Sequence, residues 1–291
     1  MTKLMSMRSL IFMTALCSGL LMSCQSSENP QGSNPAADSS PTDSGAQADG
    51  EAGTLQVAAN GEDFVRQGFT SKDGWKISFD HVYVNLADVT AYQTDPPFDP
   101  DAKDPLQAKS EVAIPAQTVD LAAGDESAAP ITVGEAEAPA GQYNALAWKM
   151  AKATDGPAAG QTLVLVGQAS KDGKTVDFTL NVDREFAYTC GEFVGDERKG
   201  VVQPSEAADL EATFHFDHVF GDGELPADDE MNVKALGFAP LASISDGSSL
   251  KANWATLKQK LDPKDFQALD TALVGLGHVG EGHCRSEQTT A

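Results

Sequence analysis

The sequence is poor in positive charge. It contains 20 lysine and arginine residues against 43 aspartate and glutamate residues, which gives its 291 residues a formal net charge of −23. Nucleic-acid binding depends on Lys and Arg side chains that neutralise phosphates. Docking on anionic lipid through a basic face needs the same side chains. The composition therefore argues against both kinds of partner.

Long apolar runs and common enzyme motifs are also missing. No segment reaches the roughly 18 consecutive apolar residues of a membrane-spanning helix. The sequence has no G-x-S-x-G nucleophile elbow, no P-loop and no Gly-rich dinucleotide fingerprint. These absences make an enzyme the less favoured class of function.

The N-terminus has the three parts of an export signal in the correct order. Lys3 and Arg8 precede an apolar stretch from Leu10 to Met22, which ends in Leu21-Met22-Ser23-Cys24. This ending resembles the lipobox of bacterial lipoproteins. The resemblance implies that residues 1–23 are a signal peptide and that Cys24 is acylated, with palmitate or a similar chain. The alternatives are an ordinary secretory signal or a short buried helix, with Cys24 incidental in either case.

The lipoprotein resemblance also implies a location. The chain would be held in the bacterial cell envelope by its lipid, and Gln25 after the cysteine is similar to the pattern for outer-membrane retention in enteric bacteria. Residues 24–60 are mainly Ser, Gly, Ala, Pro, Asp and Gln, without Lys or Arg. We expect them to form a disordered acidic tether, and we expect residues 61–291 to form a single domain.

Only two cysteines remain in that domain, Cys190 and Cys284. Export places them in an oxidising compartment, where such a pair most often forms a disulfide. The alternative, which the neighbouring His283 keeps open, is that one or both are thiolate ligands of a metal.

The hydrophobic pattern predicts a mainly β fold, a β-sandwich with one or two short helices near the C-terminus. Segments rich in β-branched and aromatic residues predict strands, and 171–174 predicts a hairpin turn. Asp262 and Pro263 predict the start of a helix that stops near Gly275, and a second helix is predicted over 250–261. The expected strands cover 75–92, 112–121, 142–150, 162–169, 175–186 and 210–220.

One short motif supports the sandwich. The sequence Pro139-Ala140-Gly141-Gln142-Tyr143 resembles the P-A-G-x-Y turn of transthyretin-like β-sandwich domains, which recur in bacterial lipoproteins of unassigned function. The resemblance covers about residues 75–150 and implies nothing about activity.

The five histidines are unevenly placed. His81 and His218 both follow an aspartate in the tetrapeptide Phe-Asp-His-Val, and His215 lies three residues before His218. His278 and His283 lie in a Gly-rich tail. The apolar alternation changes phase at Asp80-His81 and again at Asp217-His218, which predicts a β-bulge at each pair. Such bulges would put His215, Asp217 and His218 on one face, and likewise Asp80 and His81.

Imidazole is a common ligand of Zn²⁺ and Cu²⁺, and a carboxylate often orients the ring. The sequence therefore predicts a transition-metal site built from His215 and His218, completed by His278, His283 or His81. Asp217 and Asp80 would be ligands or orienting groups. The alternative is that each histidine has a local structural role. Calcium in the acidic loops 95–104 or 222–230 is less favoured, because neither loop has the EF-hand order.

Three functions remain. The favoured one is metal uptake, transfer or buffering by a lipid-anchored envelope protein, with an envelope transporter as partner. The second is a structural or interaction lipoprotein of an envelope assembly, without a metal. The third and least favoured is a metal-dependent hydrolase.

Overall fold

The computed structural model describes residues 51–191, 199–280 and 282–289 of the chain. The predicted signal peptide, Cys24 and the first part of the predicted tether lie outside the described residues. Among the helices of the described part, none has both the length and the apolar character needed to cross a membrane.

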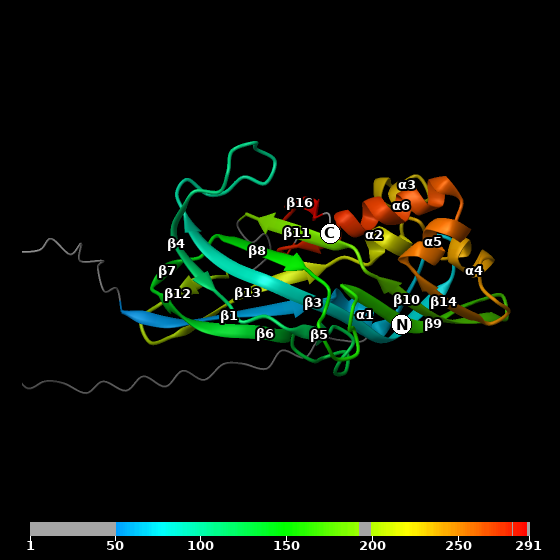
Figure 1. Cartoon of the computed structure of the whole chain (residues 1–291), viewed down its shortest axis with the longest axis horizontal. Helices are drawn as coiled ribbons and strands as arrows, with labels where there is room; N and C mark the ends of the chain where they lie inside the picture. Colours follow the sequence, from blue (N-terminus) through cyan, green and yellow to red (C-terminus); the bar gives the residue numbers. More distant parts are fainter. Residues whose placement is uncertain (1–50, 192–198, 281, 290–291) are drawn as a thin grey trace, which may run out of the picture. The chain divides into compact units, whose positions relative to one another are not determined.

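The fold is mainly β, as predicted, and its strands form two principal sheets around one core (Figure 1). The smaller sheet contains a parallel pair, β1 with β13, flanked on either side by antiparallel neighbours. Its order is β15 (Gly277–His278), β13 (Ala207–Phe214), β1 (Ala52–Asn60) and β6 (Ile131–Pro139).

The larger sheet is organised by one long strand, β3 (Lys76–Thr94), which pairs with β9 along its first half and with β8 along its second. The shorter strands β2 (Phe69–Thr70), β4 (Ala108–Ala113) and β5 (Thr118–Asp120) also pair with β3. The order is β14 (Ser249–Asn253), β10 (Lys174–Val182), β9 (Leu163–Lys171), β3, β8 (Ala145–Met150), β11 (Glu185–Cys190) and β16 (Cys284–Thr289). A separate two-stranded ladder joins β7 (Gly141–Gln142) to β12 (Val201–Val202).

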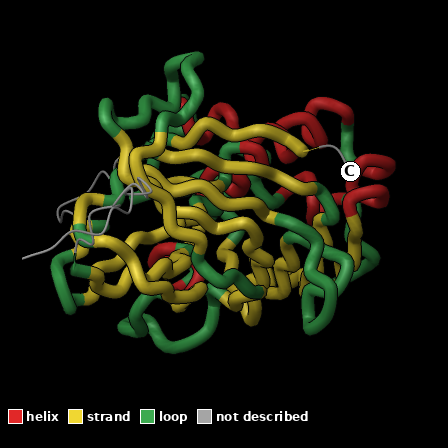
Figure 2. Tube along the Cα trace, turned by 60° about the vertical axis from the view of Figure 1, so that its left-hand side comes forward, coloured by secondary structure: helices red, strands yellow, loops and turns green. Residues whose placement is uncertain are grey.

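Most of the helices gather at one end of the sheets (Figures 1 and 2). They are α2 (Asp217–Phe220), α3 (Glu230–Lys234), α4 (Ala239–Ser243), α5 (Trp254–Lys260) and α6 (Pro263–Val274), whereas α1 (Glu62–Gln67) follows β1. The predicted N-cap of α6 is confirmed, since the Asp262 side chain accepts a hydrogen bond from the amide of Lys264.

The prediction that residues 24–60 form a disordered tether was wrong for the last nine of these residues. Residues 52–60 form β1, and alternate side chains from Leu55, Val57 and Ala59 are fully buried between the sheets. A strand of small and polar residues escapes composition-based reasoning because β13 and β6 supply the hydrogen-bonding partners and most of the surrounding apolar surface.

Two other local predictions have mixed outcomes. The hairpin at 171–174 is confirmed, and its central residues Asp172 and Gly173 have the positive φ angles, 50° and 78°, of a tight hairpin turn. The helix predicted over 250–261 begins only at Trp254. The residues before it form β14, which pairs with β10 and buries Leu250 and Ala252.

Candidate functional site: a histidine cluster at the end of strand β13

The first two histidines of the cluster lie where β13 is followed by α2: His215 lies between the two elements, and His218 lies within α2. The predicted strand over 210–220 ends early at Phe214, so the bulge predicted at Asp217-His218 was wrong. Instead the His215 amide donates to the Leu276 carbonyl (3.1 Å), and the His218 amide donates to the His215 carbonyl (3.2 Å). Residues three apart in a helical turn share one side, so His215 and His218 still meet, with ring centroids 5.4 Å apart.

Burial fixes this turn. Phe216, Val219 and Phe220 are almost fully buried in the core, so the backbone between the two histidines has little freedom. His215 and Asp217 are also buried, with 7% and 9% of their surface exposed. One ligand atom from each of His215, Asp217 and His218 lies within 4.8 Å of those of the other two. The structure thus brings together three of the predicted metal ligands.

His278 joins the cluster from a distant part of the chain. It lies on β15, whose pairing with β13 places His278 opposite Thr213. Its ring centroid is 4.3 Å from that of His215 and 5.1 Å from that of His218. His283 lies beyond it, with its ring 5.3 Å from the ring of His278. Four of the five histidines therefore lie in one group of neighbouring rings.

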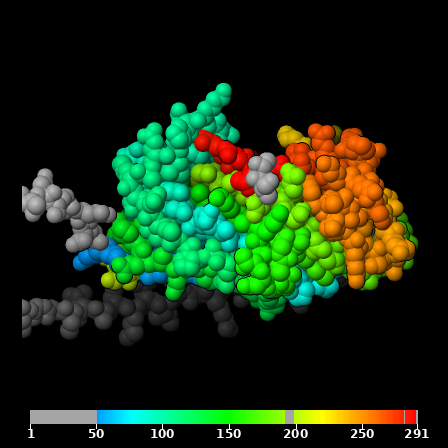
Figure 3. Space-filling view, in the orientation of Figure 1, coloured from blue at the N-terminus to red at the C-terminus, as the bar shows by residue number. Residues whose placement is uncertain are grey.

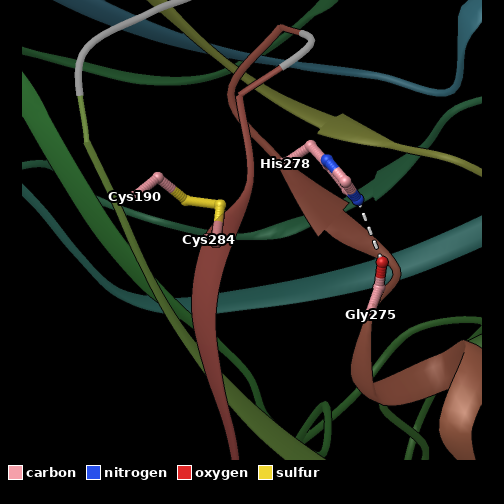
Figure 4. Close-up of a disulfide and its surroundings, with 4 residues drawn as sticks. All are labelled: Cys190, Gly275, His278 and Cys284. Carbon is pink, nitrogen blue, oxygen red and sulfur yellow. Dashed lines mark hydrogen bonds between the residues drawn. A yellow bond between two sulfur atoms is a disulfide. The ribbon is translucent and has the colours of Figure 1, made fainter. Parts of the chain in front are cut away.

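The carbonyl of Gly275 orients two of these rings. It lies 3.1 Å from Nε2 of His278 (Figure 4) and 3.2 Å from Nδ1 of His218. Each ring therefore directs its other nitrogen elsewhere. For His278 this is Nδ1, which is buried and has no hydrogen-bond partner among the residues that the structure describes. A buried nitrogen without a partner is costly in a protein interior unless a ligand uses it.

The surroundings keep His278 neutral. Burial, together with the proximity of His215 and His218, lowers the pKa of His278 from 6.5 to about 3. The neutral ring is the form that binds a metal ion.

The cluster borders a cavity of about 530 Å³. His218, His278 and His283 line one side of it, and Met231 and Lys234 of α3 and Thr271 of α6 line other parts. The group is therefore accessible to small solutes, although His215 and Asp217 are buried behind it.

The predicted disulfide is confirmed. The sulfur atoms of Cys190 and Cys284 are 1.93 Å apart, at a point where β11 and β16 pair. Cys284 also lines the cavity. Figure 3 shows β16, in red, beside the orange C-terminal helices. Because Cys284 directly follows His283, the disulfide fixes the chain at that point.

His81 and Asp80 belong to a different place. The register of β3 with β9 shifts between Phe79 and His81, so the bulge predicted there is confirmed. His81 Nδ1, however, is 2.7 Å from the carboxylate of Asp120, and its ring stacks on Tyr83. Within the described ranges, neither His81 nor Asp80 belongs to the group of ligand atoms around His215. The sequence interpretation was wrong to include them, because a repeated tetrapeptide says nothing about which strands are neighbours.

A residue missed by the sequence interpretation lies beside His215. The carboxylate of Glu62 approaches His215 Nδ1 at 3.5 Å. Because β1 and β13 are parallel and in register through Asn60 and Thr213, the residues that follow them leave the sheet together. No sequence signal could have found Glu62 while residues up to 60 were assigned to a tether.

The acidic loop at 95–104 is tied to β16 by a side chain. The guanidinium group of Arg285 donates hydrogen bonds to the backbone carbonyls of Asp99, Pro100, Ala102 and Asp104 and lies over the ring of Phe98. The backbone oxygens of this loop that could coordinate a calcium ion therefore already accept hydrogen bonds from Arg285. In the other acidic loop, Asp229 accepts a hydrogen bond from the Met231 amide at the start of α3.

Comparisons with protein-family models, with curated proteins and with solved structures gave no match. The resemblances to the lipobox and to the P-A-G-x-Y turn therefore rest on their own residues. Within the turn, the Tyr143 hydroxyl donates a hydrogen bond to the Pro139 carbonyl (3.1 Å).

Proposed function

We propose that this protein is a lipid-anchored protein of the bacterial envelope that binds Zn²⁺ or Cu²⁺ through His215, His218 and His278, for uptake, transfer or buffering of the metal. Asp217 is the fourth ligand in this proposal. The observation that best supports this proposal is the short distance between the three imidazole rings, whose centroids are 4.3, 5.1 and 5.4 Å apart.

These distances fit a shared ion. Zinc–nitrogen bonds are about 2.0–2.1 Å long, so the centroid of a bound imidazole lies about 3.2 Å from the metal, and two such centroids at a tetrahedral angle are about 5 Å apart. His215, Asp217 and His218 already have ligand atoms within 4.8 Å of one another, and the buried Nδ1 of His278 would have to turn toward the same ion. Orientation of His218 and His278 by a backbone carbonyl is typical of metal-binding histidines.

The cavity supports transfer rather than a purely structural ion. His283 also lines it, with its ring next to that of His278, and this fourth imidazole can receive an ion that enters or leaves. The chain's excess of acidic residues favours the approach of cations in general, without selecting among them.

Metal content of the purified full chain tests this proposal. The protein is exposed to Zn²⁺ or Cu²⁺, desalted and analysed by mass spectrometry. We expect about one equivalent of metal in the wild type and its loss in the His215→Gln/His218→Gln variant, which keeps the side-chain size. His81→Gln is the matched control and should retain the ion, because His81 is paired with Asp120 elsewhere.

The same experiment addresses the rival function. If neither the wild type nor the variant retains metal while both are folded by circular dichroism, the metal proposal is wrong. The chain would then be a structural or interaction lipoprotein, and the search should turn to protein partners.

The cavity also favours a second candidate, a metal-dependent hydrolase. A metal held by the three histidines with one open coordination position on the side of the cavity could bind and activate a water there. Hydrolysis of a generic activated ester by the zinc-loaded protein, lost in the His215→Gln/His218→Gln variant, would support this candidate. Equal rates in both proteins would exclude it for that substrate class.

A further inference from the structure

Glu62 has a backbone conformation that is unfavourable for its side chain. Its φ is 58°, in the left-handed region that residues with a Cβ atom rarely adopt and that glycine adopts freely. Glutamate lacks the short side chain that helps Asn and Asp there. The amide of Glu62 donates to Oδ1 of Asn60 (2.9 Å), which holds the chain in this turn.

A partly buried polar network supports the turn. Nδ2 of Asn60 donates to Glu211 (2.9 Å), whose other oxygen is paired with Lys199 (2.9 Å). Asn60 and Glu211 lie on the parallel strands β1 and β13, so the sheet itself positions the residue that follows. Strain of this kind persists where the surrounding structure enforces it, and it concentrates at functional sites.

The consequence of this conformation is the position of the Glu62 carboxylate. It lies 3.5 Å from Nδ1 of His215, and the two side chains are only 25% and 9% exposed. Nε2 of His215, on the other side of the ring, is buried. A carboxylate against one nitrogen of a metal-binding histidine fixes the ring and strengthens the other nitrogen as a donor.

We infer that Glu62 is the positioning residue of the proposed metal site: its carboxylate holds Nδ1 of His215 so that Nε2 faces the ion. This inference rests on the proposed function. The carboxylate also places a negative charge next to the three imidazoles, which favours a divalent ion over Cu⁺. The cargo is then Zn²⁺ or Cu²⁺ rather than monovalent copper.

The variant Glu62→Gly separates function from folding. Glycine suits a φ of 58° better than glutamate, so the thermal midpoint of the metal-free protein should be equal to or higher than that of the wild type. The dissociation constant for Zn²⁺ should nevertheless rise by about 10- to 100-fold, the usual effect of losing such a partner. The affinity for Cu⁺ should fall less, because that ion carries less charge.

Two further variants complete the test on the full chain. Ser205→Gly is the matched control, since Ser205 has a φ of 60° and lies outside the cluster; its Zn²⁺ affinity should equal that of the wild type. Glu62→Gln keeps an oxygen that can accept from Nδ1 but loses the charge. Its Zn²⁺ affinity should fall between those of the wild type and Glu62→Gly.

The outcomes are distinguishable. A wild type that binds neither ion overturns the proposed function and this inference together. A wild type that binds Zn²⁺ while Glu62→Gly binds it equally well overturns this inference alone. An equal loss of Zn²⁺ and Cu⁺ affinity would contradict the assigned preference for a divalent ion. A lower thermal midpoint in Glu62→Gly would mean that Glu62 supports the fold rather than the site.

Discussion

At the scale of single residues, the cluster depends on which nitrogen of each imidazole is already engaged. The Gly275 carbonyl takes one nitrogen of His218 and one of His278, and Glu62 lies against one nitrogen of His215. Each ring thus has a defined orientation before any ion arrives. A preorganised site of this kind binds without first ordering its ligands.

The buried state of His278 predicts an acid-dependent loss of stability in the metal-free protein. Its folded pKa of about 3 lies below the 6.5 of an unfolded chain, so the folded state binds fewer protons between these values. The contribution of His278 to the free energy of unfolding is complete above about pH 6.5. It is lost progressively as the pH falls toward 3, and the free energy of unfolding then changes by at most about 1.4 kcal/mol per pH unit.

Urea unfolding at pH 7.5, 6, 5 and 4 measures this slope. His278→Gln does not titrate, so its free energy of unfolding should fall less on acidification than that of the wild type. Parallel pH dependences in the two proteins would contradict the burial of a neutral His278.

Tyr188 packs against Gly277, the residue before His278. Its buried hydroxyl donates to the Leu273 carbonyl (3.0 Å), and burial raises its pKa well above the usual value of 10. Above about pH 10 the unfolded chain loses the tyrosine proton and the folded chain does not, so this contribution to stability falls as the pH rises. Tyr188→Phe should be about 1 kcal/mol less stable at pH 7 and should lose less stability than the wild type between pH 9 and 11, as measured by urea unfolding.

At the scale of elements, part of the site could be predicted from the sequence and part could not. The spacing of His215 and His218 was informative although the predicted bulge is a helical turn, because either conformation puts both rings on one side. The exclusion of His81 and the presence of Glu62 depend on strand order. Strand order is a long-range property, and β1 in particular has too few apolar residues to be recognised as a strand from the sequence.

Because β1 lies in the middle of its sheet, shortening one of its buried side chains should strongly lower the free energy of unfolding, although the segment is only modestly hydrophobic. Leu55 is fully buried between the sheets, so Leu55→Ala should lower the free energy of unfolding by about 2–5 kcal/mol. Gln56→Ala is the control on the other face of the strand, where its side chain makes one exposed hydrogen bond to Thr132, and it should cost under about 1 kcal/mol. Chemical denaturation measures both, and equal small effects would mean that residues 52–60 are a tether after all.

At the scale of the whole molecule, the disulfide joins β11 to β16. It closes a sequence separation of 94 residues and holds β16, and with it the segment that carries His278 and His283. The sequence predicted the bond because the predicted export signal and lipidation site leave only two cysteines for the domain. It could not predict that the bond would border the cavity, since that depends on the packing of α3 and α6.

Removal of this bond should destabilise the folded chain. Opening a loop of this length raises the entropy of the unfolded state, so the Cys190→Ser/Cys284→Ser variant should lose about 3–5 kcal/mol in free energy of unfolding. Urea titrations of the oxidised wild type and the variant measure the loss. The reduced wild type is the control and should match the variant, whereas an unchanged midpoint in both would show that β16 is held by its other contacts alone.

The central claim is that one transition-metal ion lies between His215, His218 and His278, and anomalous diffraction from crystals of the zinc-loaded protein tests it most directly. The account predicts an anomalous peak at the zinc edge about 2 Å from one nitrogen of each of these three rings. A peak confined to His81 and Asp120 or to the acidic loops, or no peak in crystals grown with excess zinc, would contradict it.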